Sequence, residues 1–374
     1  MSGAASASRR RRSPVLVIGA GVAGAACALR LRALGMAVDL VEKTTFPRAK
    51  VCGCCLGETG LQALSQLGLR ERVRERAVRT HRWAASLGGR RVELEIPSGV
   101  AISREVLDPL MLEAAIQAGV RVRMDCAAKI EGECAQAVTV KLVQPTATVR
   151  ADYRCVVIAS GLRAGGVQGL LPWTELPHGP FGVSFMASSA EIDTGVIYMA
   201  CHADGYVGMV KLADGRVDVA AALHSGASSA ALGDPVTRVE SILAASEFAP
   251  LGLTDRSAVM TTPPLRRARR RGHGRLLAIG DAAGYVEPFT GEGMTWGMQS
   301  GIAAAEWIAA RQAQLQTAGD QWHEQLEIRL RRKQRTCRLV TAMLRSPVVC
   351  RIAAATLDWC PGLAAPLLRS LNKT

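Results

Sequence analysis

The feature that most constrains the fold is a glycine-rich turn between an apolar strand and a helix near the start of the chain. The run Val15–Ile18 predicts a buried strand, and a helix is expected from about 23 to 34, ended by Gly35. Between them, three glycines keep a Gly-x-Gly-x-x-Gly spacing: Gly19, Gly21 and Gly24. A second predicted strand, at about 37–41, ends at Glu42. This order of elements is a βαβ unit, which predicts a Rossmann-like sheet.

The chemistry of this unit is that of a dinucleotide site. Glycines allow the tight turn and let the backbone come close to a pyrophosphate, whose charge then faces the N-terminus of the helix. The carboxylate of Glu42 can accept hydrogen bonds from ribose hydroxyls, and Lys43 beside it is a further candidate cofactor residue. The alternative is that the glycines only pack the helix against the strand.

A second block identifies the dinucleotide. The apolar run 276–279 predicts a short buried strand, and Gly280 and Asp281 follow it directly. Asp281 can hold a ribityl or ribose hydroxyl. A turn then precedes a helix expected at about 292–311, and its candidate cofactor residues are Pro288, Gly291 and Gly293. Backbone N–H groups at such a turn can face the carbonyl edge of an isoalloxazine, where negative charge gathers on reduction, so the block predicts FAD.

Composition supports a folded enzyme and excludes other classes. Of the 374 residues, 49% are hydrophobic and 21% charged, which excludes a disordered or fibrous chain. The net charge is +14, but only 4% of the residues are aromatic, so we expect no nucleic-acid partner. The 11 cysteines show no disulfide framework, and no apolar run reaches the about 18 residues of a membrane span. We expect a cytoplasmic protein, and contact with a membrane surface stays open.

The order of predicted elements divides the chain into interleaved parts. Residues 78–103 predict a hairpin, and residues 180–224 alternate in the manner of an antiparallel sheet. We therefore expect an α/β (α+β) fold: a Rossmann-like FAD-binding domain, an interleaved antiparallel-sheet substrate domain and C-terminal helices. The predicted parts are a disordered basic tail at 1–13, the FAD-binding domain at 14–77, 101–170 and 257–310, the substrate domain at 78–100 and 171–256, and a C-terminal helical region at 311–374.

Five blocks together resemble the geranylgeranyl reductase family of the p-hydroxybenzoate hydroxylase-like FAD superfamily. They are GAGVAG with Glu42, PRAKVCG (47–53), SREVLDPLML (103–112), VVIASG (156–161) and GDAAGYVEPFTGEGM (280–294). The resemblance implies that Arg104 lies near the FAD pyrophosphate, that Gly161 belongs to the cofactor site, and that the block starting at Gly280 contacts the ribityl chain and the flavin ring. It also implies that Cys52 and Gly53 lie at the flavin face, which makes them our candidate catalytic residues.

Departures from related families bear on the reaction. Hydroxylases of the superfamily usually carry Ala-Asp-Gly followed by a Ser and an Arg, and the segment 159–164 lacks that Asp and the Ser after the glycine, which favours reduction over hydroxylation. The Trp-x-Trp-x-Ile-Pro signature of flavin-dependent halogenases is absent, so halogenation is not expected. The Gly205–Tyr206 pair of typical geranylgeranyl reductases is present, but the Trp, Phe and Pro that follow it there are not. The substrate can therefore differ from a geranylgeranyl chain.

Three cysteines gather in one short segment: Cys52, Cys54 and Cys55. Their spacing does not match a zinc knuckle and no second cluster pairs with them, so we predict no metal. A thiol at this position can serve as a proton donor or a redox partner beside the flavin. The alternative is that these cysteines are buried structural residues.

A basic run precedes the predicted strand 276–279, and its arginines are Arg266, Arg267, Arg269, Arg270 and Arg271. Such runs are usually solvated surface. The functional alternatives are docking of an acidic carrier protein, binding of an NADPH 2′-phosphate, and contact with an anionic membrane, the last together with the apolar segment 348–371.

Three hypotheses about function follow. The first is an FAD-dependent reductase that transfers hydride from flavin N5 to a C=C bond of a hydrophobic, isoprenoid or polyketide-like substrate, with Cys52 as a candidate proton donor. The second is a flavin monooxygenase, and the third a flavin-binding redox sensor. NADPH or another reductant would donate electrons transiently, because the chain has one dinucleotide fingerprint. The oligomeric state is not predicted.

Candidate residues for an apolar substrate tunnel are Phe181, Phe185, Met186, Met199 and Met209.

Overall fold

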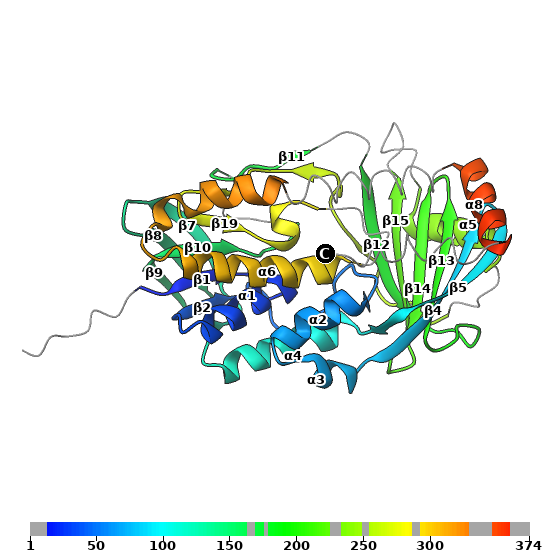
Figure 1. The fold of residues 1–374 in the computed structure, drawn as a ribbon, viewed down its shortest axis with the longest axis horizontal. Coiled ribbons are helices and arrows are strands. Elements are labelled where there is room, and N and C mark those ends of the chain that lie inside the picture. The colour runs from blue at the N-terminus through cyan, green and yellow to red at the C-terminus, as the bar shows by residue number, and fades with distance from the viewer. Residues whose placement is uncertain are drawn as a thin grey trace, which may run out of the picture.

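The structure is a computed structural model, and it describes residues 13–162, 169–175, 179–224, 233–248, 254–285, 292–328 and 346–359. The described residues form two large β-sheets that lie side by side along the long axis of the molecule (Figure 1). The mixed α/β fold predicted from the sequence is therefore confirmed. The predicted tail, 1–13, lies outside the described residues except for Ser13.

The first sheet has the topology that the βαβ unit predicts. In spatial order its strands are β18 (Gly272–His273), β19 (Leu276–Ala278), β10 (Cys155–Ile158), β1 (Val15–Ile18), β2 (Val38–Val41) and β6 (Arg121–Arg123). Every neighbouring pair from β19 to β6 is parallel, and β18 joins β19 antiparallel. All residues of β1, β2 and β10 are buried, because both faces of the sheet are covered.

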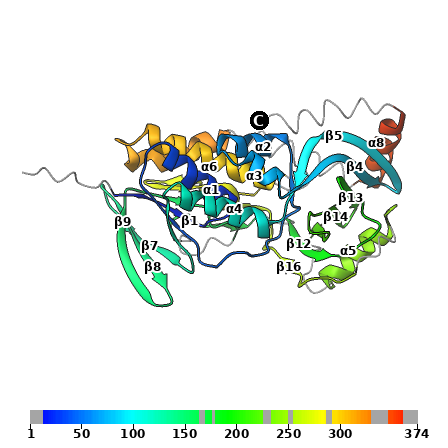
Figure 2. The ribbon, with the colours of Figure 1, turned by 90° about the horizontal axis from the view of Figure 1, so that it is seen from below.

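Helices cover one face of this sheet and a small three-stranded sheet covers the other (Figure 2). The helices are α1 (Val22–Ala33), α2 (Glu58–Gln66), α3 (Arg70–Arg74), α4 (Arg104–Gln117) and α6 (Gly293–Ala310), and residues 318–328 are also helical. The small sheet is formed by β7 (Ala127–Glu133), β8 (Val138–Gln144) and β9 (Ala147–Tyr153). Helices α1 and α6 pack very closely, since a Cβ on Gly301 would lie 2.3 Å from the carbonyl oxygen of Ala23.

The second sheet has eight strands and is antiparallel except at one pair. In spatial order they are β16 (Met260–Thr261), β12 (Pro180–Ala187), β15 (Val217–His224), β14 (Gly205–Lys211), β13 (Val196–His202), β4 (Val78–Leu87), β5 (Arg90–Ala101) and β3 (Cys55–Leu56). Strands β13 and β4 pair in parallel, which joins the predicted hairpin to the later strands. Helix α5 (Pro235–Ala244) packs against this sheet, and α8 (Pro347–Trp359) lies beside β4 and β5 (Figure 1).

The two sheets only partly follow the predicted division into domains. Strand β3 comes from the segment 14–77 and strand β16 from the segment 257–310, yet both belong to the eight-stranded sheet. Two further strands, β11 (Thr174–Glu175) and β17 (Arg267–Ala268), pair outside both large sheets. The domain boundaries themselves stay a prediction.

The arginine run is not simply a solvated surface. Arg269 and Arg271 are only 5% and 6% exposed. The guanidinium of Arg269 lies over the ring of Trp173, with its carbon 4.1 Å from the ring centroid, and donates to the carbonyl oxygens of Leu171 and Ala282. Arg271 forms an ion pair with Glu327. These two arginines tie the segment before β19 to its neighbours.

Candidate cofactor and substrate site

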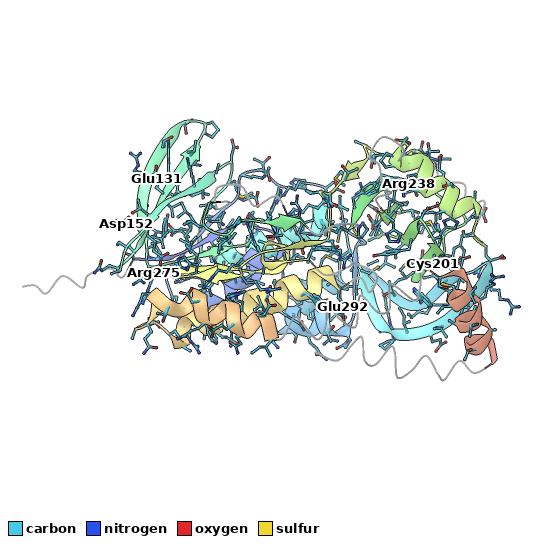
Figure 3. The ribbon with its side chains drawn as sticks, turned by 90° about the horizontal axis from the view of Figure 1, so that it is seen from above. Glu131, Asp152, Cys201, Arg238, Arg275 and Glu292 are labelled. Atoms are coloured by element: carbon cyan, nitrogen blue, oxygen red, sulfur yellow. The ribbon has the colours of Figure 1, made fainter. Side chains whose placement is uncertain are left out.

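A cavity of about 1620 Å³ lies between the two sheets. One end is lined by the β1–α1 turn, the end of β2 and the start of α6, and the other by strands β4, β5, β13 and β14. Glu292, at the start of α6, lies near the junction of the two halves (Figure 3). Single ligand pockets usually measure roughly 300–1,000 Å³. The cavity therefore has room for a dinucleotide and a second ligand.

Two glycines bring β1 and α1 together at the first end. Gly19 has a φ of +106°, which residues with side chains rarely adopt. A Cβ on Gly19 would lie 2.5 Å from the carbonyl oxygen of Ala159, and a Cβ on Gly24 would lie 1.8 Å from the carbonyl oxygen of Gly19. The close packing of strand and helix thus requires glycine at both positions. Val22 and Ala23, at the N-terminus of α1, line the cavity.

Glu42 lies at the end of β2 with only 4% of its surface exposed. Its carboxylate accepts hydrogen bonds from Ala20 N at 3.0 Å, from Thr44 N and Oγ1 at 3.2 and 3.1 Å, and from Arg48 Nη2 at 3.0 Å. These bonds fix its orientation on the cavity wall. The exposed Lys43 lines the cavity beside it.

Two cations lie over the glycine turn. A Cβ on Gly21 would lie 3.1 Å from Lys50 Nζ and 3.3 Å from Arg104 Nη2. Arg104 also donates Nε and Nη2 to the two carboxylate oxygens of Asp108, at 2.7 and 2.8 Å. The net positive charge and the N-terminus of α1 together complement a pyrophosphate. Burial, reinforced by the charge of Arg104, lowers the pKa of Lys50 to about 8.

This lowered pKa gives a testable pH dependence. The free protein loses the Lys50 proton near pH 8, whereas a bound pyrophosphate favours the protonated amine and raises its pKa. FAD affinity is therefore expected to fall as pH rises through 8, by about tenfold between pH 7 and pH 9. Fluorescence titration of flavin-free protein with FAD measures it. In Lys50→Gln the affinity should be lower and independent of pH over this range, whereas Lys43→Gln should keep the wild-type dependence. A Lys50→Gln variant with the wild-type pH profile contradicts the assignment.

Gly280 and Asp281 follow β19 and begin a short 3-10 helix, η2 (Gly280–Ala283). The N–H of Gly280 donates to Ser300 Oγ at 2.9 Å, which anchors the turn to α6. Burial raises the pKa of Asp281, and the charges of Lys50 and Arg104 oppose this increase. Because Asp281 lines the same cavity within the field of these cations, the β19 turn and the β1 turn contribute to one site.

Most predicted site residues come together in this cavity. The ones that line it are Gly19, Glu42, Lys43, Cys52, Gly53, Arg104, Gly161, Gly280, Asp281 and Gly293. Gly21 and Gly24 lie behind the wall. Gly21 lets Lys50 and Arg104 come close to the turn, and Gly24 lets α1 come close to the end of β1. Pro288 and Gly291 lie outside the described residues. The roles assigned to these residues stay predictions.

The second end of the cavity is largely apolar. Side chains of the eight-stranded sheet line it, with Ala353 and Thr356 of α8; those that decide its character are Trp83, Leu87, Leu94, Ile96, Met199 and Tyr206. Of the predicted tunnel residues, Met199 therefore has its side chain on the wall, whereas Met209 borders the cavity but its side chain is 1% exposed and packs in the core beneath α5. Phe181, Phe185 and Met186 do not line the cavity: Phe185, for example, is 1% exposed in the core beneath α5, because its side chain points to the opposite face of β12.

Cys52 and Gly53 lie on the wall between the two ends. Cys54 has a φ of +51° and is 1% exposed, so it is turned away from the cavity. A hydrogen bond from Cys54, with the positive charge of Arg104, lowers the pKa of Cys52 to about 6 against the effect of burial. Both interactions favour the thiolate form of Cys52. Among the described residues, no three His, Cys, Asp or Glu side chains form a metal site.

Three residues in or next to the site were not singled out by the sequence motifs. Lys50 carries a signal only through the block 47–53, and Asp108 only through its i,i+4 spacing from Arg104 in one helix. Asp218 is 1% exposed and lies on β15, in contact with the segment 52–55. Its only signal in the sequence is a single acid within an alternating apolar strand.

The topology of the first sheet and the glycine turn are those of a dinucleotide-binding flavoprotein, and the cavity that they border has an apolar second end. Residues 12–338 match the family model described as FAD binding domain. The chain belongs to this family and is an FAD-dependent oxidoreductase, as predicted. In the described part of the chain, no helix is long and apolar enough to cross a membrane.

Similar proteins include both reductases and monooxygenases. The chain is 26% identical over 321 residues to the menaquinone reductase of Mycobacterium tuberculosis, covering 79% of this chain and 76% of that protein. It is 29% identical over 345 residues to the kynurenine 3-monooxygenase of Salinispora arenicola, covering 80% and 73%. The resemblance to geranylgeranyl reductases thus holds at the level of the broader FAD family.

Solved structures of both kinds share the fold. A geranylgeranyl bacteriochlorophyll reductase-like protein of Thermoplasma acidophilum superposes with a TM-score of 0.75 at 17% identity, covering 92% of this chain and 90% of that one. The p-nitrophenol 4-monooxygenase of Pseudomonas putida gives 0.74 at 16% identity, covering 96% and 95%. At these identities the likeness concerns the fold and not the reaction.

Proposed function

We propose that the protein uses FAD to reduce a carbon–carbon double bond of an apolar, unsaturated small molecule of the isoprenoid or polyketide type. The observation that carries this proposal is the apolar chamber, which is continuous with the dinucleotide end and has Cys52 on the wall between them. The similarity to proteins named menaquinone reductase points in the same direction.

The residues at the first end fit FAD. Lys50 and Arg104 would hold the pyrophosphate, Glu42 a ribose, and Asp281 a hydroxyl of the ribityl chain, which accounts for the buried charges around the glycine turn. When bound, FAD supplies hydride transfer at N5. We propose NADPH or another transient reductant as electron donor, because the sequence carries one dinucleotide fingerprint.

The chain's own residues would position the substrate and supply the proton. Trp83, Leu94 and Met199 enclose an apolar molecule and keep water from the reacting bond. Cys52 reaches the cavity from the segment between the two ends and, once protonated, would give its proton to the substrate carbon that does not receive the hydride. The product then carries two more hydrogens than the substrate.

Cys52→Ala tests the proposed proton transfer. Turnover is expected to fall about 100-fold or more, since general acid catalysis usually contributes a factor of that size, while the flavin content stays unchanged. Mass spectrometry of the product under anaerobic conditions should show a gain of two hydrogens with the wild type. Cys134→Ala, at an exposed position outside the cavity lining, is the matched control and should retain full turnover. Unchanged turnover in Cys52→Ala would exclude this residue as the acid.

A monooxygenase is the second candidate, favoured by the 29% identity to the kynurenine 3-monooxygenase. The same assay separates the two, because a monooxygenase would give, in air only, a product heavier by one oxygen atom. If that product forms, the assignment changes from reduction to hydroxylation. The redox-sensor hypothesis would instead require reversible oxidation of the cysteines, which thiol titration before and after mild oxidation measures.

A further inference from the structure

The segment 52–55 makes an unusual contact with the eight-stranded sheet. Cys54 packs in a small apolar cluster with Met186, Val210 and Leu212, and Cys52 and Cys55 border it. In the sheet, Asp218 of β15 pairs with Met186 on one side and Val210 on the other, so its carboxyl reaches the same cluster. A lone acid therefore lies in an apolar contact directly behind the wall that carries Cys52.

The surroundings of Asp218 favour its neutral form. The residue is 1% exposed, and its Oδ1 is buried without a hydrogen-bond partner among the described residues. Burying a carboxylate whose oxygen has no hydrogen bond costs much free energy, whereas burying a protonated carboxyl costs much less. Burial, with the nearby Cys52, raises the pKa of Asp218 well above its usual value; Cys54 and the charge of Arg216 only partly oppose this.

Cys54 connects the two groups. Its side chain packs in the cluster that Cys52 borders and that Asp218 reaches, and it lowers the pKa of both groups, the effect of a thiol that can donate to either. The left-handed backbone of Cys54, with a φ of +51°, is uncommon for a residue with a side chain, and it directs the thiol toward the sheet rather than into the cavity. The N–H of Ile102 donates to the carbonyl oxygen of Cys54 at 2.8 Å, which pins this conformation to the end of β5.

We propose that Asp218, Cys54 and Cys52 form one hydrogen-bonded chain in which neutral Asp218 donates to the Cys54 sulfur and the Cys54 thiol donates to a Cys52 thiolate. Asp218 and Cys54 are then positioning residues that act through Cys52. The other charged or titratable groups facing these three residues are Cys55, Arg216 just before β15, and Arg104 and Asp108 of α4.

If the protein reduces its substrate as proposed, the hydrogen-bonded chain of Asp218, Cys54 and Cys52 holds in reserve the proton that Cys52 transfers. The Cys54 proton first moves to the Cys52 thiolate while the Asp218 proton moves to Cys54, and the Cys52 thiol formed in this way then gives its proton to the substrate carbon. Water later returns one proton to Asp218, so the balance is one proton per reduced bond. The ionisation of Cys52 itself can be measured without any substrate.

The test is the pH profile of Cys52 alkylation in the flavin-containing protein, with the thiols kept reduced. Iodoacetamide labelling is followed by peptide mass spectrometry that resolves Cys52 from Cys54 and Cys55, and the ultraviolet absorbance of the thiolate gives a second reading. The wild type should show a midpoint near pH 6. Cys54→Ala removes the donor, so the rate at pH 6.5 should fall at least about tenfold. Cys54→Ser keeps a donor and should restore most of the rate.

Asp218→Asn tests the charge of the carboxyl. If Asp218 is neutral, this isosteric and uncharged replacement leaves the Cys52 midpoint within about half a pH unit. If Asp218 is an anion, removing its charge beside the thiolate lowers the midpoint by about one unit or more. Asp214→Asn, a partly exposed acid in the turn before β15, is the control. Three results would each contradict the proposed hydrogen-bonded chain. They are a wild-type midpoint of Cys52 alkylation at pH 8 or above, an unaltered pH profile in Cys54→Ala, and a large shift of the midpoint in Asp218→Asn. None of these outcomes depends on whether the enzyme reduces or hydroxylates its substrate.

Discussion

Gly24→Ala is expected to give a colourless protein that has lost FAD and much of its stability. The added Cβ would lie 1.8 Å from the carbonyl oxygen of Gly19 and 3.0 Å from its carbonyl carbon. Both atoms belong to backbone that is also fixed by the pairing of β1 with two neighbouring strands, so neither side can yield without disrupting the turn. Overpacking in a well-packed core costs about 1–3 kcal/mol and occasionally more, and this contact, being backbone on backbone, should reach the upper end.

The measurements are the flavin-to-protein absorbance ratio after purification and the thermal midpoint of unfolding. Gly132→Ala is the matched control, because a Cβ at that position on β7 would meet no atom within 4 Å. It should bind FAD as the wild type does. A Gly24→Ala protein that purifies with normal flavin content would show that the turn tolerates a side chain and would remove the steric basis of the site.

Arg104→Ala is expected to have the second-largest effect, through the charge that it leaves behind. Asp108 is 0% exposed, and the guanidinium of Arg104 donates to both of its oxygens. Removing one partner of a buried ion pair typically costs about 3–5 kcal/mol, because the other charge stays buried and unpaired. The free energy of unfolding should fall by this amount even in flavin-free protein, and FAD retention should be lost as well.

Urea denaturation of the flavin-free protein separates the two effects. The double variant Arg104→Ala with Asp108→Ala should recover at least half of the lost stability but none of the FAD binding. The control is Arg30→Ala, whose pair with Glu306 is exposed and should contribute less than about 1 kcal/mol. A loss below about 1 kcal/mol in Arg104→Ala, or FAD binding restored in the double variant, would refute the role given to Arg104.

The dinucleotide end of the site could be predicted from sequence because its requirements are local. The turn at Gly19 needs a positive φ, the helix must start directly after it, and Glu42 must end the next strand. These demands fall within about thirty consecutive residues, and glycines and an acid rarely keep this spacing around a strand and a helix unless a dinucleotide binds there. The same holds for Gly280 and Asp281, which come one residue after a buried strand.

The substrate end could not be predicted in the same detail, because its residues meet only through non-local pairing. An alternating strand does not reveal which face points to the cavity, so Phe185 and Met199 look equivalent in sequence although one is core and the other wall. The parallel pairing of β13 with β4 joins segments more than a hundred residues apart. The contact between Asp218 and Cys54 depends on both of these features.

The position of the last strand of the parallel sheet matters during synthesis. Strand β19 and helix α6 come late in the chain, yet α6 covers α1, a helix whose first ten residues are buried except for Arg30 at one side. Until the ribosome has released residues beyond 310, α1 and the β10 edge lack their final neighbours. A partly made chain therefore exposes apolar surface and an unpaired strand edge for most of its translation, the condition under which nascent proteins aggregate or require chaperones.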